Sequence, residues 1–294
     1  MTLDQLRIFI AVAERSHMTR AATALGMTQS ATSAAVATLE RQSGVKLFDR
    51  VGRGIELTDA GRRFLPEARA VVERARIARA VLEQSSNRVS GTVSIGASQT
   101  IANHWLPRRL AAYHQAFPNV QLEITIGNTQ AIESAVFAGR VDVGLVEGPI
   151  THEELIRRVV DTDRPMLVVA AGSGLPQVSG DRIDLMNLSW VIREKGSGTR
   201  RLLEELCERQ KVDFAALRVV LELPSNEAVC EAVEAGAGAT IISEQVAGAA
   251  LKAGRLRAVP VDLPQREFAL LRHSERTLSP AQRALADALS DQRT

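Results

Sequence analysis

The chain has 294 residues, 45% of them apolar and 24% charged, which is the composition of a globular protein of about two domains. This composition excludes a disordered or collagenous chain, and Cys207 and Cys230 are too few cysteines for a disulfide scaffold. An acid, Asp4, stands where a secretory signal carries positive charge, and no apolar run reaches the ~20 residues that span a bilayer. We therefore expect a cytoplasmic protein that does not enter a membrane.

The net charge of +2 conceals two segments of opposite sign. Residues 1–90 contain 14 Lys and Arg against 9 Asp and Glu, whereas residues 91–294 contain 22 against 25. A basic head on an acidic body favours contact between the head and a polyanion such as DNA. The excess is modest, so charge alone does not separate this interpretation from chance.

The head begins with two predicted helices. Apolar residues recur at helical spacing over 3–14, namely Leu6, Phe9, Ile10 and Ala13. Ser16 and Thr19 are candidate N-caps of a short helix over 20–25, which Gly26 would end. A further helix follows this glycine, and two helices joined by a tight Gly-containing turn form a helix-turn-helix.

The helix after the turn carries the main functional signal. Thr28 is its candidate N-cap and Gly44 its candidate end. At about 100° per residue, one face can pack: Thr28, Ala31, Thr32, Ala35, Val36 and Leu39. The opposite face is small and polar near its start: Gln29, Ser30, Ser33, Ala34 and Ala37, with Glu40 and Arg41 further along.

That small, polar face suits a helix that lies in the major groove of DNA. Short side chains let the backbone approach the bases, and a glutamine such as Gln29 can pair bidentately with adenine. Ser30 and Ser33 suit phosphates or base edges. The alternative is the solvated face of an ordinary helix, which would usually carry more Lys and Glu.

A β-hairpin wing is expected next. Residues 46–50 and 53–58 alternate in polarity around Gly52 and Gly54. Arg50 and Arg53 would lie at the tip of this hairpin, where they are candidates for contact with phosphates or the minor groove.

This order of features resembles the LysR-type transcriptional regulators. The resemblance rests on ordered motifs: Leu6-x-x-Phe9, Ala21-Ala22-x-x-Leu25, Thr28-Gln29-Ser30-Ala31-x-Ser33, Leu39-Glu40, Gly44-Val45-x-Leu47-Phe48-x-Arg50 and Leu57-Thr58-x-x-Gly61. The family often has an arginine where this chain has Ala34. The resemblance implies a winged helix-turn-helix that reads an interrupted palindrome in double-stranded DNA as a homodimer or homotetramer, with RNA polymerase as a possible further partner.

A long helix is expected over 60–84, with Thr58 as its cap and Pro66 within its first turns. Its apolar seam alternates spacings of three and four: Leu65, Ala68, Val72, Ala75, Arg79 and Leu82. Such a seam suits packing on a copy of itself, and the resemblance favours that dimer. The alternative is docking on its own domain. Residues 85–88 would form a hinge.

From residue 89 short apolar strands alternate with helices, which predicts an α/β fold. Strands are expected over 93–96, 120–126, 141–146, 166–170, 190–192, 219–223, 240–242 and 268–271. The layout resembles the family's periplasmic-binding-protein-like effector domain. We expect a DNA-binding domain over 1–58, a linker helix over 59–88 and an effector domain over 89–294. Its lobe I would span about 90–162 and 266–294 and its lobe II about 163–265, with crossovers near 161–164 and 261–267.

Polar residues gather where several expected strands end. Ligands in such folds bind beyond the carboxyl ends of strands, so these residues are the candidate effector site: Ser98, Gln99, Thr100, Asn128, Ser197, Thr199, Ser225 and Asn226. Hydroxyls and free N–H groups at helix starts suit an anion. Plain N-capping is the alternative for any single one. Glu147, also at a strand end, would orient a pocket amine or arginine, or reject larger acids.

Two strings resemble the branch of the family that contains sulfur- and carbon-assimilation regulators: Gly96-x-Ser98-x-Thr100-Ile101 and Arg193-Glu194-x-Gly196-Ser197-Gly198-Thr199-Arg200. That resemblance implies a small anion or organic acid as effector, held by hydroxyls and amides rather than by a salt bridge. No cofactor or metal is expected, because the five histidines lack metal-ligand spacing, and no nucleophile elbow identifies an enzyme. The alternatives are a cytoplasmic small-molecule binding protein and a redox-responsive regulator that uses Cys207 and Cys230, although buried free thiols are the simpler interpretation.

Overall fold

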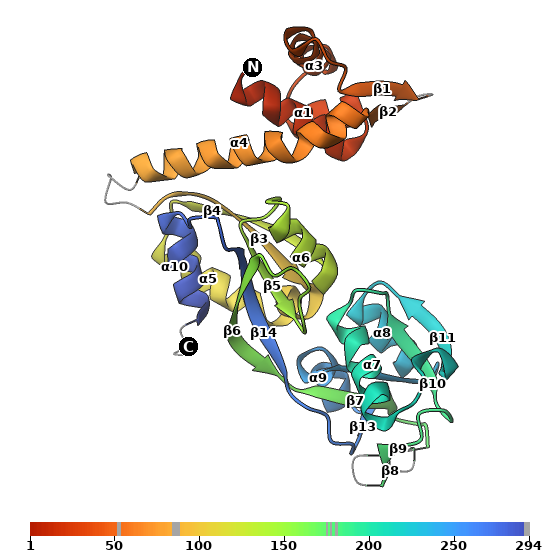
Figure 1. Ribbon diagram of the computed structural model, residues 1–294. Coiled ribbons are helices and arrows are strands. Elements are labelled where there is room, and N and C mark those ends of the chain that lie inside the picture. The colour runs from red at the N-terminus through yellow and green to blue at the C-terminus, as the bar shows by residue number, and fades with distance from the viewer. Residues whose placement is uncertain (52–53, 84–88, 175, 177, 180–181, 291–294) are drawn as a thin grey trace. The chain divides into compact units, whose positions relative to one another are not determined.

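The computed structural model describes residues 1–51, 54–83, 89–174, 176, 178–179 and 182–290. The chain divides into an N-terminal unit, Met1–Arg88, and a C-terminal unit, Val89–Thr294 (Figure 1). None of the described helices is long and apolar enough to cross a membrane.

Three helices begin the N-terminal unit: α1 (Leu3–Arg15), α2 (Met18–Ala24) and α3 (Gln29–Ser43). Helix α1 starts in a capping box between Thr2 and Gln5. The expected N-caps of α2 were wrong: His17 caps the helix by accepting from the N–H of Thr19, and Ser16 ends α1 with φ 49°. The turn at Ser16 leaves His17 as the first extended residue, so the cap falls there.

A two-stranded wing and the long helix complete this unit: β1 (Phe48–Val51), β2 (Gly54–Leu57) and α4 (Asp59–Glu83). Thr58 caps α4 as expected, since its hydroxyl accepts a 3.0 Å hydrogen bond from the N–H of Gly61. Pro66 lies inside the helix. Leu65, Ala68 and Val72 pack with Leu6 and Phe9 of α1, so the first half of the seam docks on its own unit.

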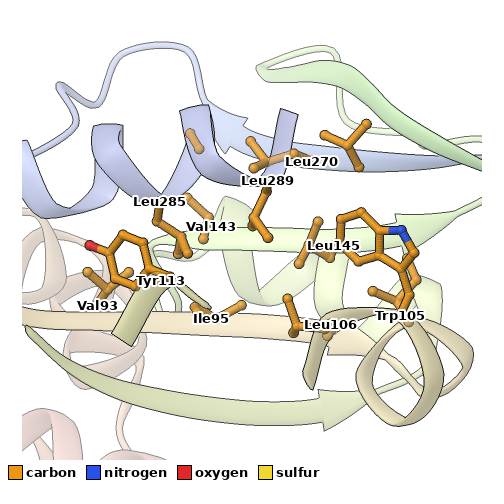
Figure 2. Packing of buried hydrophobic residues seen from close by; sticks show 14 of the residues in the cluster. Val93, Ile95, Trp105, Leu106, Tyr113, Val143, Leu145, Leu270, Leu285 and Leu289 are labelled. Atoms are coloured by element: carbon orange, nitrogen blue, oxygen red, sulfur yellow. The ribbon is translucent and has the colours of Figure 1, made fainter. Parts of the chain in front are cut away.

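The first sheet of the C-terminal unit has the order β4-β3-β5-β14-β6. Its strands are β3 (Gly91–Ser98), β4 (Val120–Gly127), β5 (Val143–Glu147), β6 (Leu155–Asp163) and β14 (Arg266–His273). The helical turn η1 (Ile101–Trp105), α5 (Leu106–Ala116) and α10 (Pro280–Ser290) pack on one face, where Tyr113 and Leu285 meet (Figure 2). Helix α6 (Thr129–Phe137) covers the other face.

The second sheet has the order β11-β10-β12-β7-β13. Its strands are β7 (Pro165–Ala170), β10 (Ser189–Arg193), β11 (Arg218–Leu223), β12 (Ala239–Ser243) and β13 (Leu256–Val259). Helix α7 (Gly198–Gln210) packs on one face, and α8 (Asn226–Glu234) and α9 (Glu244–Lys252) pack on the other. A short hairpin, β8 (Val178–Ser179) and β9 (Arg182–Ile183), and the turn η2 (Phe214–Ala216) complete this lobe.

The chain passes between the two sheets twice. Strand β6 ends at Asp163 and β7 begins at Pro165, and the return runs through residues 260–265 before β14. Because β14 pairs antiparallel with both β5 and β6, the last strand closes the first sheet from a position far along the chain. The two sheets therefore form two lobes that share a pair of crossing segments.

Candidate functional site

The start of helix α3 presents a small polar surface. Thr28 caps the helix by accepting a 3.2 Å hydrogen bond from the N–H of Ala31, and its hydroxyl lies 3.1 Å from that of Ser30. Gln29, Ser30 and Ala34 are exposed and Ser33 is half-buried. The expected packing face was too wide, since Thr28 and Ala31 are exposed. The helix buries a narrower stripe: Thr32, Val36, Leu39 and Glu40.

Glu40 does not belong to the outer face that the helical pattern gave it. Its side chain is 10% exposed and turns toward the wing, where Oε1 accepts hydrogen bonds from the N–H groups of Leu47 at 2.8 Å and Phe48 at 3.2 Å. Burial opposes ionisation of this carboxyl, but the Leu47 N–H and the Lys46 ammonium outweigh it and hold the pKa of Glu40 below its ordinary value. A carboxylate thus joins helix α3 to the wing.

Of the two arginines predicted at the wing, the structure describes only the backbone of Arg50. The backbone of Arg50 pairs with Ile55 in the hairpin, and its side chain lies outside what the structure describes. Arg53 lies outside the described residues altogether. Their contact with DNA stays a prediction.

Several of the predicted effector residues come together between the two lobes of the C-terminal unit, around Glu147. This side chain ends β5 and is 3% exposed. One carboxylate oxygen accepts a hydrogen bond from the hydroxyl of Ser98, and the other accepts one from the hydroxyl of Thr100 at 3.1 Å. The carbonyl of Glu147 accepts from Thr129 at 2.9 Å. Four polar groups from three junctions of lobe I therefore meet at one point.

An arginine from the end of the chain completes this cluster. Arg266, the first residue of β14, donates from Nε to Asp163 at 2.7 Å and from Nη2 to Thr100 at 3.4 Å. Its Nη1 lies 3.5 Å from a carboxylate oxygen of Glu147 but has no hydrogen-bond partner. The sequence pattern offers only one hint of Arg266, a charged residue at the start of an apolar strand.

Asn226 carries the network into lobe II. Its side chain is fully buried, and its Nδ2 donates a 3.0 Å hydrogen bond to the hydroxyl of Thr100 in lobe I. Its Oδ1 accepts from the guanidinium of Arg193 and from the hydroxyl of Thr199 at 3.3 Å. Arg193 in turn holds both oxygens of Glu194, at 2.7 and 2.9 Å. Burial opposes ionisation of Glu194, but Arg193 keeps its pKa low.

Two further predicted residues also bridge the lobes. Gln99 donates to the carbonyl of Pro224 at 2.9 Å and accepts from the N–H of Asn226 at 3.0 Å. Asn128 donates to Glu194 at 3.1 Å. Both side chains are half-buried, so water can replace these two contacts between the lobes.

Helix capping accounts for part of the predicted set. Ser197 accepts from the N–H of Thr199 at 3.2 Å, Ser225 accepts from that of Ala228 at 3.0 Å, and Asn128 accepts from that of Ala131 at 2.9 Å. The contacts of Ser197 and Ser225 are those of helix caps, as the capping alternative predicts. Asn128 both caps a helix and joins the two lobes. Residue spacing alone could not separate these two roles.

A cavity of about 250 Å³ lies beside Glu147. Both lobes line it, and its lining includes Thr129, Glu133, Glu147, Lys195, Ser197 and Arg201. Gly196 at its edge has φ 87°, and a Cβ there would lie 2.6 Å from the side-chain oxygen of Gln130. Glycine is required at this turn because any larger residue would be strained and would also collide across the lobes.

The two cysteines lie apart from this network. Cys207 on α7 and Cys230 on α8 are buried free thiols in different apolar clusters. Burial raises the pKa of Cys207 to about 11 and that of Cys230 to about 12, so both are protonated at neutral pH. Within the described ranges no three His, Cys, Asp or Glu side chains are grouped as metal ligands would be.

Two family models match the chain: "Bacterial regulatory helix-turn-helix protein, lysR family" over residues 3–62, and "LysR substrate binding domain" over residues 86–294. The chain is 35% identical to YeiE, an uncharacterized HTH-type transcriptional regulator of Escherichia coli (strain K12), over 98% of this chain and 96% of that protein. It is 31% identical to the regulator CbbR of Rhodospirillum rubrum, over 96% and 94% respectively.

Solved structures share the fold. Full-length CbnR complexed with its target DNA matches with a TM-score of 0.66 and 22% identity, over 98% of this chain and 99% of that one. The regulatory domain of CcmR from Synechocystis PCC6803, in complex with 2-PG, matches with a TM-score of 0.63 and 24% identity, over 69% of this chain and 99% of that one.

Proposed function

The chain belongs to the LysR family of DNA-binding transcriptional regulators with an effector-binding domain, and we propose that it reads DNA with the start of helix α3 and is switched by a small acidic effector between its lobes. The observation that carries the effector assignment is the convergence of Ser98, Thr100 and Glu147 of lobe I with Thr199 and Asn226 of lobe II. These residues lie far apart in the sequence and meet in one hydrogen-bonded network, and Glu147 also lines the cavity between the lobes.

The DNA-reading residues of this proposal are Thr28, Gln29, Ser30, Ser33, Ala34, Arg50 and Arg53. Support comes from the exposed amide and hydroxyl groups at the start of α3, which match the donors and acceptors that base edges require. The solved relative CbnR binds its target DNA with the same fold. The expected site is an interrupted palindrome bound by a homodimer or homotetramer, because two copies of one reading head bind two half-sites.

The effector of this proposal is a small anion or organic acid. Support comes from the hydroxyls and the buried guanidinium that surround Glu147, and from the relative CcmR, whose regulatory domain binds 2-PG. Binding between lobes that are joined by two crossing segments would shift their closure, and in an oligomer this shift would change the spacing of the reading heads. Regulation rather than catalysis is proposed, in the cytoplasm where bacterial DNA lies.

Selection of genomic fragments by the purified full-length chain, followed by gel shifts at fixed salt, tests the DNA half of the proposal. Gln29→Ala is expected to weaken binding to the selected site at least tenfold, since a bidentate base contact is worth about 1–3 kcal/mol. Gln42→Ala, at the other end of the same helix, is the matched control and is expected to bind normally. If Gln29→Ala binds the selected site as tightly as Gln42→Ala, α3 is not the helix that reads DNA.

Thermal shifts with sulfate and 2-PG test the effector half. A ligand at 100 times its dissociation constant stabilises the protein by about 2.7 kcal/mol. Ser98→Ala and Thr199→Val are expected to lose this stabilisation and to keep DNA binding, while Thr125→Val on exposed strand β4 keeps both. Undiminished stabilisation of both pocket variants would place the effector elsewhere.

A further inference from the structure

The carboxylate of Glu147 sits where the carboxylate of a ligand would be expected. It is 3% exposed, and it accepts hydrogen bonds from the hydroxyls of Ser98 and Thr100. The guanidinium of Arg266 stands 3.5 Å away. Two hydroxyls and an arginine around one buried carboxylate are the groups that proteins use to bind an external acid.

One of the donors around Glu147 has no acceptor. Nη1 of Arg266 has no hydrogen-bond partner, although the side chain is 6% exposed. A buried guanidinium N–H without an acceptor is unfavourable, because it has lost water and gained nothing in return. Glu147 therefore fills the position between Ser98, Thr100 and Arg266 without satisfying every donor there. An acid with an oxygen closer to Nη1 would bind better.

Charge prevents such an acid from binding alongside Glu147. Arg266 already holds the carboxylate of Asp163 through Nε at 2.7 Å, and Asp163 is anchored by the hydroxyl of Ser243 at 2.6 Å. One buried guanidinium thus faces two carboxylates. A third negative charge would be poorly compensated at low dielectric, so Glu147 has to leave when an anion arrives.

The molecule provides room for that departure. Glu147 lines the cavity of about 250 Å³, whose wall also carries the exposed ammonium of Lys195. A Cβ on Gly198, the first residue of α7, would lie 2.5 Å from Cγ of Glu147, so the start of α7 in lobe II rests against this side chain. A rotation of Glu147 into the cavity would therefore change its contact with lobe II.

We propose that Glu147 is a built-in competitor for the effector: a small carboxylate or oxyanion takes its place between Ser98, Thr100 and Arg266, and Glu147 turns into the cavity beside α7. This inference rests on the effector site of the proposed function and adds the ligand's anchor, Arg266, and the group it displaces. Displacement would also let effector binding in lobe I act on lobe II, since the displaced side chain would contact the start of α7.

Removal of the competing charge tests the proposal. Glu147→Gln in the full-length protein is expected to bind sulfate and 2-PG about tenfold more tightly than the unchanged protein, by calorimetric titration at fixed ionic strength. Arg266→Lys, which keeps the charge and removes the free Nη1, is expected to weaken binding at least tenfold in either background. Glu267→Gln, an exposed carboxylate on the same strand, is the matched control and leaves the affinities unchanged.

A second variant covers the case in which Glu147→Gln folds poorly. Glu147→Ala removes the carboxylate from the position between Ser98, Thr100 and Arg266. Formate is expected to raise the thermal midpoint of this variant but not that of Glu147→Ala/Arg266→Lys. Anion affinities that depend on Ser98 yet do not rise in Glu147→Gln would overturn the competitor role and leave the effector site intact. Anion affinities that change with none of Ser98, Thr199 and Glu147 would overturn both.

Discussion

Glu40 and Leu47 are joined by a 2.8 Å hydrogen bond from the Leu47 N–H to the Glu40 carboxylate, across the turn that connects helix α3 to the wing. The same oxygen accepts from the N–H of Phe48 at 3.2 Å. One buried carboxylate thus satisfies two backbone donors at the point where β1 begins, and it fixes the wing relative to the helix that is proposed to read DNA.

Glu40→Ala is expected to lower the unfolding free energy of the N-terminal unit by about 2–3 kcal/mol, because it leaves two partly buried N–H groups without an acceptor. Differential scanning calorimetry on the full chain measures this effect. Both tryptophans, Trp105 and Trp190, lie in the C-terminal unit, so their fluorescence transition should stay in place. Glu40→Gln keeps an acceptor oxygen and is expected to lose less; an equal loss would mean that the charge, not the acceptor, matters.

The same carboxylate makes the N-terminal unit sensitive to acid. The pKa of Glu40 is lowered in the folded chain, so its ionised form favours folding. Its contribution is fully present above the ordinary glutamate pKa of about 4.3 and is lost as the pH falls through the lower folded value. The stability difference between the unchanged protein and Glu40→Gln should accordingly shrink on acidification below about pH 4. A difference that grows in acid would contradict this.

Asn226 is predicted to be the residue whose loss most weakens the contact between the lobes. Asn226→Ala removes the 3.0 Å hydrogen bond to Thr100 and leaves the buried Nη1 of Arg193 without its acceptor. We expect about 2–4 kcal/mol lower stability of the C-terminal unit, measured by the tryptophan fluorescence transition in urea. Ser225→Ala, which removes only a helix cap, is expected to cost about 1 kcal/mol. A cost for Asn226→Ala no larger than that of the cap would show that the network contributes little.

The polar junctions could be predicted from the sequence because each follows an apolar strand, and parallel strands end at a common edge. Ser98, Thr100 and Glu147 are brought together in this way, because β3 and β5 are parallel neighbours in the first sheet. Asn226 follows β11 of the second sheet and reaches Thr100 across the two lobes. Arg266 could not be predicted. It reaches Thr100 across a separation of 166 positions, because β14 returns from lobe II to pair with β5 and β6, and strand order is not written in local spacing. Glu40 was missed for a related reason: its backbone partners lie beyond the helix to which the periodicity applies.

Neither cysteine is expected to act as a redox switch. With pKa values raised to about 11 and 12, Cys207 and Cys230 remain thiols at pH 8, and both are buried. Iodoacetamide at pH 8 should therefore leave both unmodified in the folded protein and modify both in urea. Peroxide should not alter DNA binding, either by the protein without substitutions or by Cys207→Ser/Cys230→Ser. Rapid labelling of the folded chain, or a disulfide after peroxide, would contradict this.

The edge strands β4 and β11 are the surfaces that we expect a second copy of the chain to cover. Each exposes apolar side chains at a free sheet edge: Ile124 and Ile126 on β4, and Val219, Val220 and Leu221 on β11. The opposite edge of the first sheet, β6, also exposes Ile156 and Val159, but its arginines stand between them and pair with Glu267 and Asp287. Charged side chains on an edge strand discourage pairing with another sheet.

Ile126→Glu and Val220→Glu are therefore expected to weaken self-association, because each places a charge in a surface that assembly would bury. Ile156→Glu on β6 is the matched control and is expected to leave assembly unchanged. Light scattering coupled to size exclusion, over a range of concentrations, measures the effect on the full chain. Loss of assembly in Ile156→Glu with normal assembly in the other two would move the interface to the β6 edge, and the lobes would then pair through a surface that the charge pattern disfavours.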